Sequence, residues 1–73
     1  MGPVSRRAFV EYVRSEGWVP TGRARHGEKR NKAGHVRPII IPVKREIYPL
    51  VIGACLKTMG KSMPDFERWL ARR

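Results

Sequence analysis

The middle of this 73-residue chain is too polar to form an ordinary hydrophobic strand. Residues 22–34 read GRARHGEKRNKAG, and alanine supplies their only apolar side chains. A strand built from them has no apolar alternation to fix its register. The glycines at 22, 27 and 34 favour turns. The sequence therefore predicts either a basic loop over 22–34 or a polar hairpin arm, with residues 31–34 as the turn.

Half of the sixteen Lys and Arg residues lie between Arg23 and Arg45, where only Glu28 carries the opposite charge. The net charge of +10 is larger than solubility requires, although keeping a small domain soluble is the simpler explanation. Cations that neutralise phosphates release condensed counterions, so a basic segment binds nucleic acid without reading its sequence. We therefore expect RNA to be bound by eight residues: Arg23, Arg25, Lys29, Arg30, Lys32, Arg37, Lys44 and Arg45.

The length of the chain allows one domain with one modest core. We expect residues 1–73 to form that domain, with residues 1–4 disordered. Cys55 is the only cysteine, and its apolar neighbours predict a buried thiol in a helix rather than a disulfide. His26, His35 and Cys55 lack the spacing of zinc ligands, so no metal or cofactor is expected.

The apolar runs at 39–41 and 50–56 are far too short to cross a bilayer. The first residues carry neither a secretion signal nor the hydroxyl residue that a myristoylation signal needs at position 6. A cytoplasmic location with no membrane partner is the expectation.

Helix signals occur in three segments. The first begins at the capping residue Ser5 and ends at Gly17, with apolar residues 9, 10 and 13 on one face. In the second, the helical pattern begins at Glu46, a wide apolar stripe runs from Leu50 to Met59, and Gly60 ends the segment. The third begins at Ser62, with proline and aspartate in its first turn.

One segment between these helices carries a clear strand signal. Val36–Val43 contains three successive isoleucines, which are β-branched. Pro38 and Pro42 restrict it to an edge or shorten it. The resulting order is a helix, two or three short strands and two helices, and the predicted fold class is α+β.

Four segments carry a resemblance to a known family: Gly17-Trp18, the basic segment with its histidine, Ile39–Pro42, and Leu56–Phe66. Over roughly residues 5–70 they resemble, in order and spacing, the HicA family of toxin mRNA interferases from bacterial toxin–antitoxin pairs. The resemblance implies a double-stranded-RNA-binding-domain-like fold, a three-stranded antiparallel sheet with helices on one side, whereas the residues by themselves predict a two- or three-stranded antiparallel sheet. It also implies metal-independent cleavage of mRNA and inhibition by a cognate HicB-like antitoxin.

His26 occupies the position that matches the catalytic histidine of this family. An imidazole titrates near neutral pH and can accept the proton of a ribose 2′-hydroxyl. Neighbouring cations such as Arg23 and Arg25 would stabilise the additional negative charge of the transition state. The simpler alternative is a solvated loop histidine that only contacts phosphate. His35 is expected to be a turn or surface residue.

Two other functions fit the sequence. Leu50–Met59, the short Gly60-Lys61 turn and Ser62–Arg72 can be read as a helix-turn-helix, which would make the chain a non-catalytic DNA-binding module. A relative that binds RNA by shape and charge, without cleaving it, is the third alternative.

Overall fold

The structure is a computed structural model that describes residues 2–73.

Helix α1 (Arg6–Ser15) begins and ends where the sequence predicts. The Ser5 side chain accepts a hydrogen bond from the Ala8 amide, 3.1 Å away, and so caps the helix. Gly17, with φ of 91°, closes the other end, and the next amide, of Trp18, donates back to the Val13 carbonyl. This Schellman-type ending places Trp18 in the core beside Val13.

The polar segment forms a hairpin, one of the two predicted alternatives. Strands β2 (Val19–Ala24) and β3 (Gly27–Asn31) pair antiparallel, and Arg25 and His26 form the turn. The expectation of a turn at residues 31–34 describes only part of the longer connection from β3 to the next strand. The sequence could not reveal the true turn, because register here comes from pairing across the sheet rather than from apolar alternation.

Strand β4 (Ile39–Ile41) pairs antiparallel with β3 and completes a sheet of order β2-β3-β4. The predicted strand over Val36–Val43 is longer than the observed one, because Pro38 and Pro42 flank the isoleucines. Ile39 and Ile41 point into the core, whereas Val36 is 97% exposed.

A second, two-stranded sheet corrects two expectations. Strand β1 (Val4–Ser5) pairs with β5 (Glu46–Ile47). Val4 therefore belongs to a strand, although we expected residues 1–4 to be disordered. Glu46 also belongs to a strand, although we expected a helix to begin there. Met1 lies outside the described residues. The buried Ile47 and the packing of Val4 against the core explain why this short pair forms.

Helices α2 (Pro49–Met59) and α3 (Met63–Ala71) follow, and α2 begins three residues after the start that the sequence predicts. Gly60, with φ of 74°, ends α2. Ser62 and Asp65 form a reciprocal capping box at the start of α3. The observed chain is therefore an α+β domain with three helices, as the sequence predicted.

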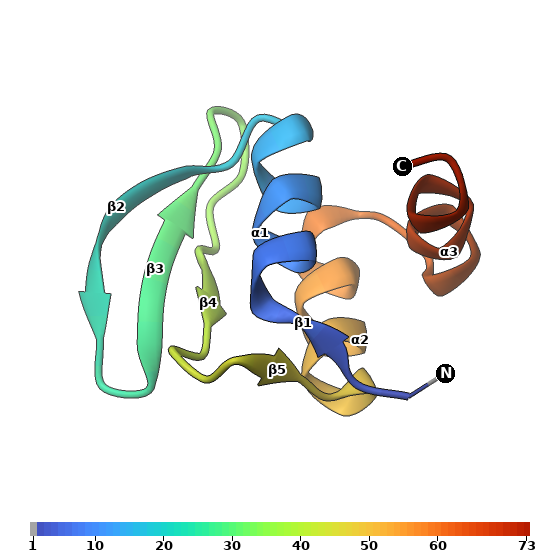
Figure 1. Cartoon of the computed structure of the whole chain (residues 1–73). Helices are drawn as coiled ribbons and strands as arrows, with labels where there is room; N and C mark the ends of the chain where they lie inside the picture. The colour runs from blue at the N-terminus through green and yellow to red at the C-terminus, as the bar shows by residue number, and fades with distance from the viewer. Residues whose placement is uncertain (1) are drawn as a thin grey trace.

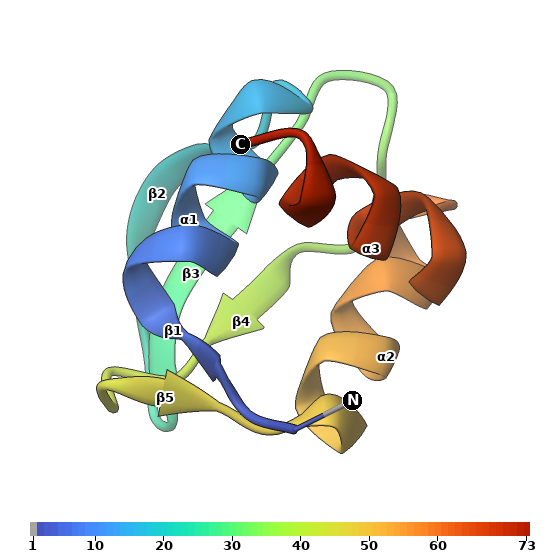
Figure 2. The ribbon, with the colours of Figure 1, turned by 45° about the vertical axis from the view of Figure 1, so that its right-hand side comes forward.

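The helices lie on one side of the three-stranded sheet, and α3 packs at the far side of α1 (Figures 1 and 2). Aromatic rings join α3 to α1: Phe9 meets Phe66 edge-on at 5.5 Å between ring centroids, and Tyr12 meets Trp69 at 5.3 Å. Such pairs add to the stability that burial provides. Among residues 2–73, no helix has the length and apolar character needed to span a membrane.

Gly27 is required at its position by close packing. A Cβ there would overlap the backbone carbonyl of Ile41 on the neighbouring strand, and backbone cannot move aside as a flexible side chain can. Gly53 in α2 is the matched contrast, because a Cβ there meets nothing within 4 Å.

We expect Gly27→Ala to lower the free energy of unfolding by about 1–3 kcal/mol, because β3 and β4 must separate. Gly53→Ala should raise it by about 0.5–1 kcal/mol, since alanine favours helix more than glycine does. Urea denaturation followed by circular dichroism measures both. A Gly27→Ala protein as stable as wild type would show that β3 and β4 do not approach this closely.

Candidate nucleic-acid interface

His26 lies at the exposed tip of the β2–β3 hairpin, in a turn of two residues. Neither Arg25 nor His26 has a positive φ, so the turn does not depend on glycine at its two central positions. The tip borders a hollow of about 790 Å³ that Arg6, Arg23 and Arg25 also line. An imidazole and three guanidinium groups therefore surround one space that is large enough for a phosphate group and part of its nucleotide.

Arg6 joins this group from a distant part of the sequence. Its Nε donates to the Pro42 carbonyl at 2.8 Å, and its backbone amide donates to the Arg45 carbonyl at 2.7 Å. These bonds hold the start of α1 beside the loop between β4 and β5. Figure 1 shows this loop, the hairpin turn and the start of α1 at the same end of the molecule. We call Arg6, Arg23, Arg25 and His26 the hairpin-end site.

Sequence reasoning missed Arg6, since it lies outside the basic segment. Its position on the polar side of an amphipathic helix is only a weak signal, because most such arginines are solvated. The tertiary fold gives it a place in the site.

Glu28 lies between two arginines at the inner edge of the site. Its carboxylate is 2.7 Å from Arg30 Nε and 3.5 Å from an Arg6 terminal nitrogen. Arg23 and Arg25 make no ion pair within residues 2–73. The hairpin-end site thus keeps a positive balance although a carboxylate borders it.

Arg30 has a structural position that the sequence did not predict. Its residue exposure is only 7%, its terminal NH1 group donates to the Trp18 carbonyl at 3.3 Å, and Glu28 neutralises its charge. A buried guanidinium with these partners does not face a phosphate. We therefore assign Arg30 to the fold and not to the RNA-binding set.

The other predicted cations divide between different parts of the surface. Lys44 and Arg45 are exposed in the loop next to the hairpin-end site. Lys29 is half-buried on β3, and strand alternation directs it to the face opposite Arg30. Lys32 and Arg37 belong to the connection between β3 and β4, at the opposite end of the sheet.

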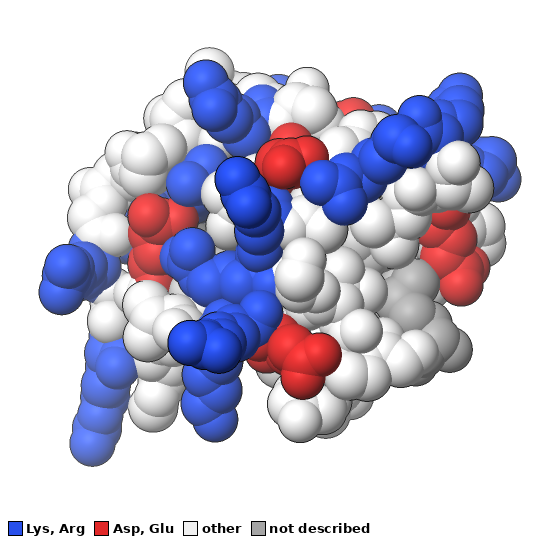
Figure 3. Space-filling model, in the orientation of Figure 1, with Lys and Arg blue, Asp and Glu red and all other residues white. Residues whose placement is uncertain are grey.

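Figure 3 shows lysine and arginine side chains over the part of the molecule that holds β2, β3 and the start of α1, and a second group at the upper right, over α3. The basic segment therefore does not form one continuous contact strip. Arg23, Arg25, Lys44 and Arg45 lie near His26, whereas Arg37 lies away from it.

Cys55 is not a candidate nucleophile. It is buried, its thiol donates a weak hydrogen bond to the Ile40 carbonyl at 3.5 Å, and burial raises its pKa to about 11. A thiol with so high a pKa is scarcely ionised at neutral pH. The buried thiol predicted from its apolar neighbours is confirmed.

Within residues 2–73, no three His, Cys, Asp or Glu side chains come together in a group that could hold a metal ion. No protein-family model, curated protein or solved structure matches this chain. The chemistry of the site therefore rests on its own residues.

We expect Glu28→Ala to lower the free energy of unfolding by about 2–3 kcal/mol, because it leaves the buried Arg30 without its carboxylate. Glu67→Ala is the matched control: it removes the same charge from an exposed position on α3 and should change stability by no more than about 0.5 kcal/mol. Urea denaturation compares the two. Equal effects would mean that Arg30 does not depend on Glu28.

Proposed function

We propose that this protein binds RNA at the hairpin-end site and cleaves it without a metal ion, with His26 as the general base. The observation that carries the proposal is the exposed imidazole of His26, which shares one hollow with the guanidinium groups of Arg6, Arg23 and Arg25. Charged donors placed around a phosphate stabilise negative charge that develops on it.

The reaction that suits these groups is internal transfer at phosphorus. The imidazole of His26 accepts the proton of the ribose 2′-hydroxyl, and the 2′-oxygen attacks the adjacent phosphorus. The bond from phosphorus to the 5′-oxygen breaks, and that oxygen takes a proton from solvent. The products are a 2′,3′-cyclic phosphate and a 5′-hydroxyl. The arginines supply positive charge where the phosphorane-like transition state needs it.

The resemblance to the HicA family supports the same proposal, since it implies metal-independent mRNA cleavage with a histidine at this position. We accordingly propose an mRNA interferase toxin of the cytoplasm, with a HicB-like antitoxin protein as its inhibitor. The α+β fold, with its three-stranded antiparallel sheet, agrees with what that resemblance implies.

DNA binding through α2 and α3 has less support. In a helix-turn-helix the first residues of the second helix approach the DNA. Here Asp65 occupies that part of α3, and hydrogen bonds from Ser62 lower the pKa of its carboxyl, so it stays ionised. Glu67 adds a second exposed carboxylate, and Lys61 in the turn pairs with Glu16 at 3.0 Å. Arg68 pairs with Asp65 at 2.5 Å, so the start of α3 presents carboxylates and paired cations to a phosphate and not free cations.

We expect His26→Ala to reduce the rate of RNA cleavage by about 10²–10⁴-fold, because the base is lost. RNA affinity should hardly change, since the cations remain. Cleavage of a labelled RNA under single-turnover conditions measures the rate, and fluorescence anisotropy measures the affinity. Wild-type cleavage should persist in EDTA and stop when the reactive ribose is 2′-deoxy.

Two results would contradict this proposal. Purified wild type that binds RNA and never cuts it would leave only an RNA-binding module. Tighter binding to a duplex DNA site, unaffected by His26→Ala, would favour the helix-turn-helix alternative.

We also expect the double variant Arg23→Ala/Arg25→Ala to weaken binding and to reduce the log–log salt slope by roughly 1.4, which is two phosphate contacts on a single strand. The control is Arg14→Ala/Arg72→Ala, which removes two exposed arginines away from the hairpin. Titrations of single-stranded RNA at several salt concentrations give the slopes. If the two double variants behave alike, binding depends on net charge and not on the hairpin-end site.

A further inference from the structure

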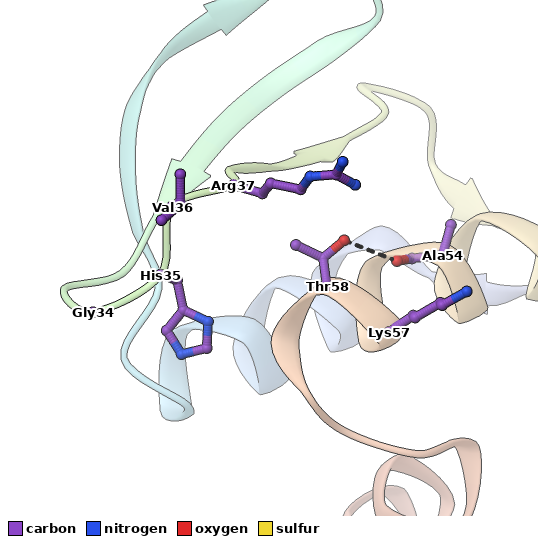
Figure 4. A pocket seen from close by; sticks show the side chains of 7 residues that line it. All are labelled: Gly34, His35, Val36, Arg37, Ala54, Lys57 and Thr58. Carbon is purple, nitrogen blue, oxygen red and sulfur yellow. Dashed lines mark hydrogen bonds between the residues drawn. The ribbon is translucent and has the colours of Figure 1, made fainter.

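A second basic hollow lies at the opposite end of β3 from His26. It has a volume of about 610 Å³ and lies between the β3–β4 connection and the C-terminal half of α2. Its lining residues are Gly34, His35, Val36, Arg37, Ala54, Lys57 and Thr58 (Figure 4). We call it the α2 hollow.

The α2 hollow is positive, and nothing in its lining offsets that charge. Arg37 and Lys57 reach it from a loop and from a helix, on either side of Ala54 and Thr58 in Figure 4. Both side chains are exposed, and neither takes part in an ion pair within residues 2–73. Two cations that face one space repel each other, and an anion between them removes that repulsion.

Local packing makes part of this hollow rigid. The imidazole of His35 rests against the buried ring of Trp18, with 4.9 Å between ring centroids. The His35 backbone amide donates to the Lys32 carbonyl at 3.1 Å, and Gly34 completes the turn with a φ of 86°. The Thr58 hydroxyl is held by its hydrogen bond to the Ala54 carbonyl at 3.3 Å. A ligand would therefore meet a ring and a hydroxyl that are already in place.

We propose that the α2 hollow binds a phosphate of the RNA backbone at a point away from the one that His26 attacks. This inference rests on the proposed function, because it takes RNA as the ligand. A phosphate suits the hollow, since guanidinium and ammonium groups are the side chains that bind phosphate most strongly. The hollow contains no acidic side chain that would repel it.

The two sites are too far apart for neighbouring phosphates. His26 precedes β3 and His35 follows it, and the five residues of β3 span about 14 Å at 3.4 Å per residue. A strand that occupies both sites must therefore extend over several nucleotides. Only RNA above a minimum length should gain affinity from the α2 hollow.

The test compares Arg37→Ala/Lys57→Ala with the charge-matched control Arg14→Ala/Arg72→Ala. Fluorescence anisotropy measures the binding of single-stranded RNA of about 4 and about 16 nucleotides, the range of site sizes seen for small single-strand-binding domains. With the longer RNA, the Arg37→Ala/Lys57→Ala variant should lose roughly 0.7 of the log–log salt slope, which is one phosphate contact. With the shorter RNA, it should match the control.

The other outcomes overturn the inference in distinguishable ways. Equal slopes for the two variants on the longer RNA would show that the α2 hollow contacts no phosphate, whether or not the protein cleaves RNA. Equal losses on both RNA lengths would show a general charge effect. If the wild type binds RNA without cutting it and the length-dependent loss persists, phosphate binding by the α2 hollow is supported and the proposed catalytic function is wrong. If the wild type binds no RNA, both fail.

Discussion

The end of the fold that carries the hairpin-end site depends on the ion pairs of the Glu28 carboxylate. This carboxylate neutralises Arg30, which lies buried in the central strand, and it also approaches Arg6 at the start of α1. Arg30 in turn donates to the Trp18 carbonyl, next to the chain that leaves α1 for β2. One carboxylate thus connects the helix, the central strand and the hairpin. A small domain has few apolar side chains to spare, and here an ion pair occupies a place on the inner side of the sheet where an apolar residue would be usual.

In the described part of the chain, the ion pairs of Glu28 also separate the cations that are neutralised inside the fold from those that remain unpaired at the surface. Arg30 and Glu28 satisfy each other inside the fold, whereas Arg23 and Arg25 at the hairpin tip have no carboxylate partner within residues 2–73. Free cations beside an exposed histidine are the combination that a phosphate-directed site requires, and this is why we place the proposed function there. The chain also keeps cations at the other end of β3, in the α2 hollow, so its positive charge is distributed along the sheet and not confined to one loop.

The apolar side of the molecule serves to hold these surfaces in position. Trp18, Phe9, Phe66 and the inward isoleucines form one core, and α3 is attached to α1 through aromatic rings. The close approach of Gly27 to the Ile41 carbonyl fixes β3 against β4, immediately after the turn that carries His26. Backbone packing at Gly27 therefore helps to set the position of the histidine that precedes it.

Local chemistry is what the sequence by itself determined. Ser5, Gly17, Gly60 and Ser62 mark helix ends because caps and left-handed turns depend on residues a few positions apart, and the fold class followed from their order. Tertiary structure alone decided the hairpin turn at Arg25-His26, the pairing of Val4 with Ile47, the burial of Arg30 and the arrival of Arg6 beside His26. Each of these joins residues across the chain or depends on which face of a strand is covered. The order of residues along the chain shows neither which distant residues meet nor which face of a strand is covered. A basic strand has the same sequence pattern whether its arginine is solvated or paired inside the fold.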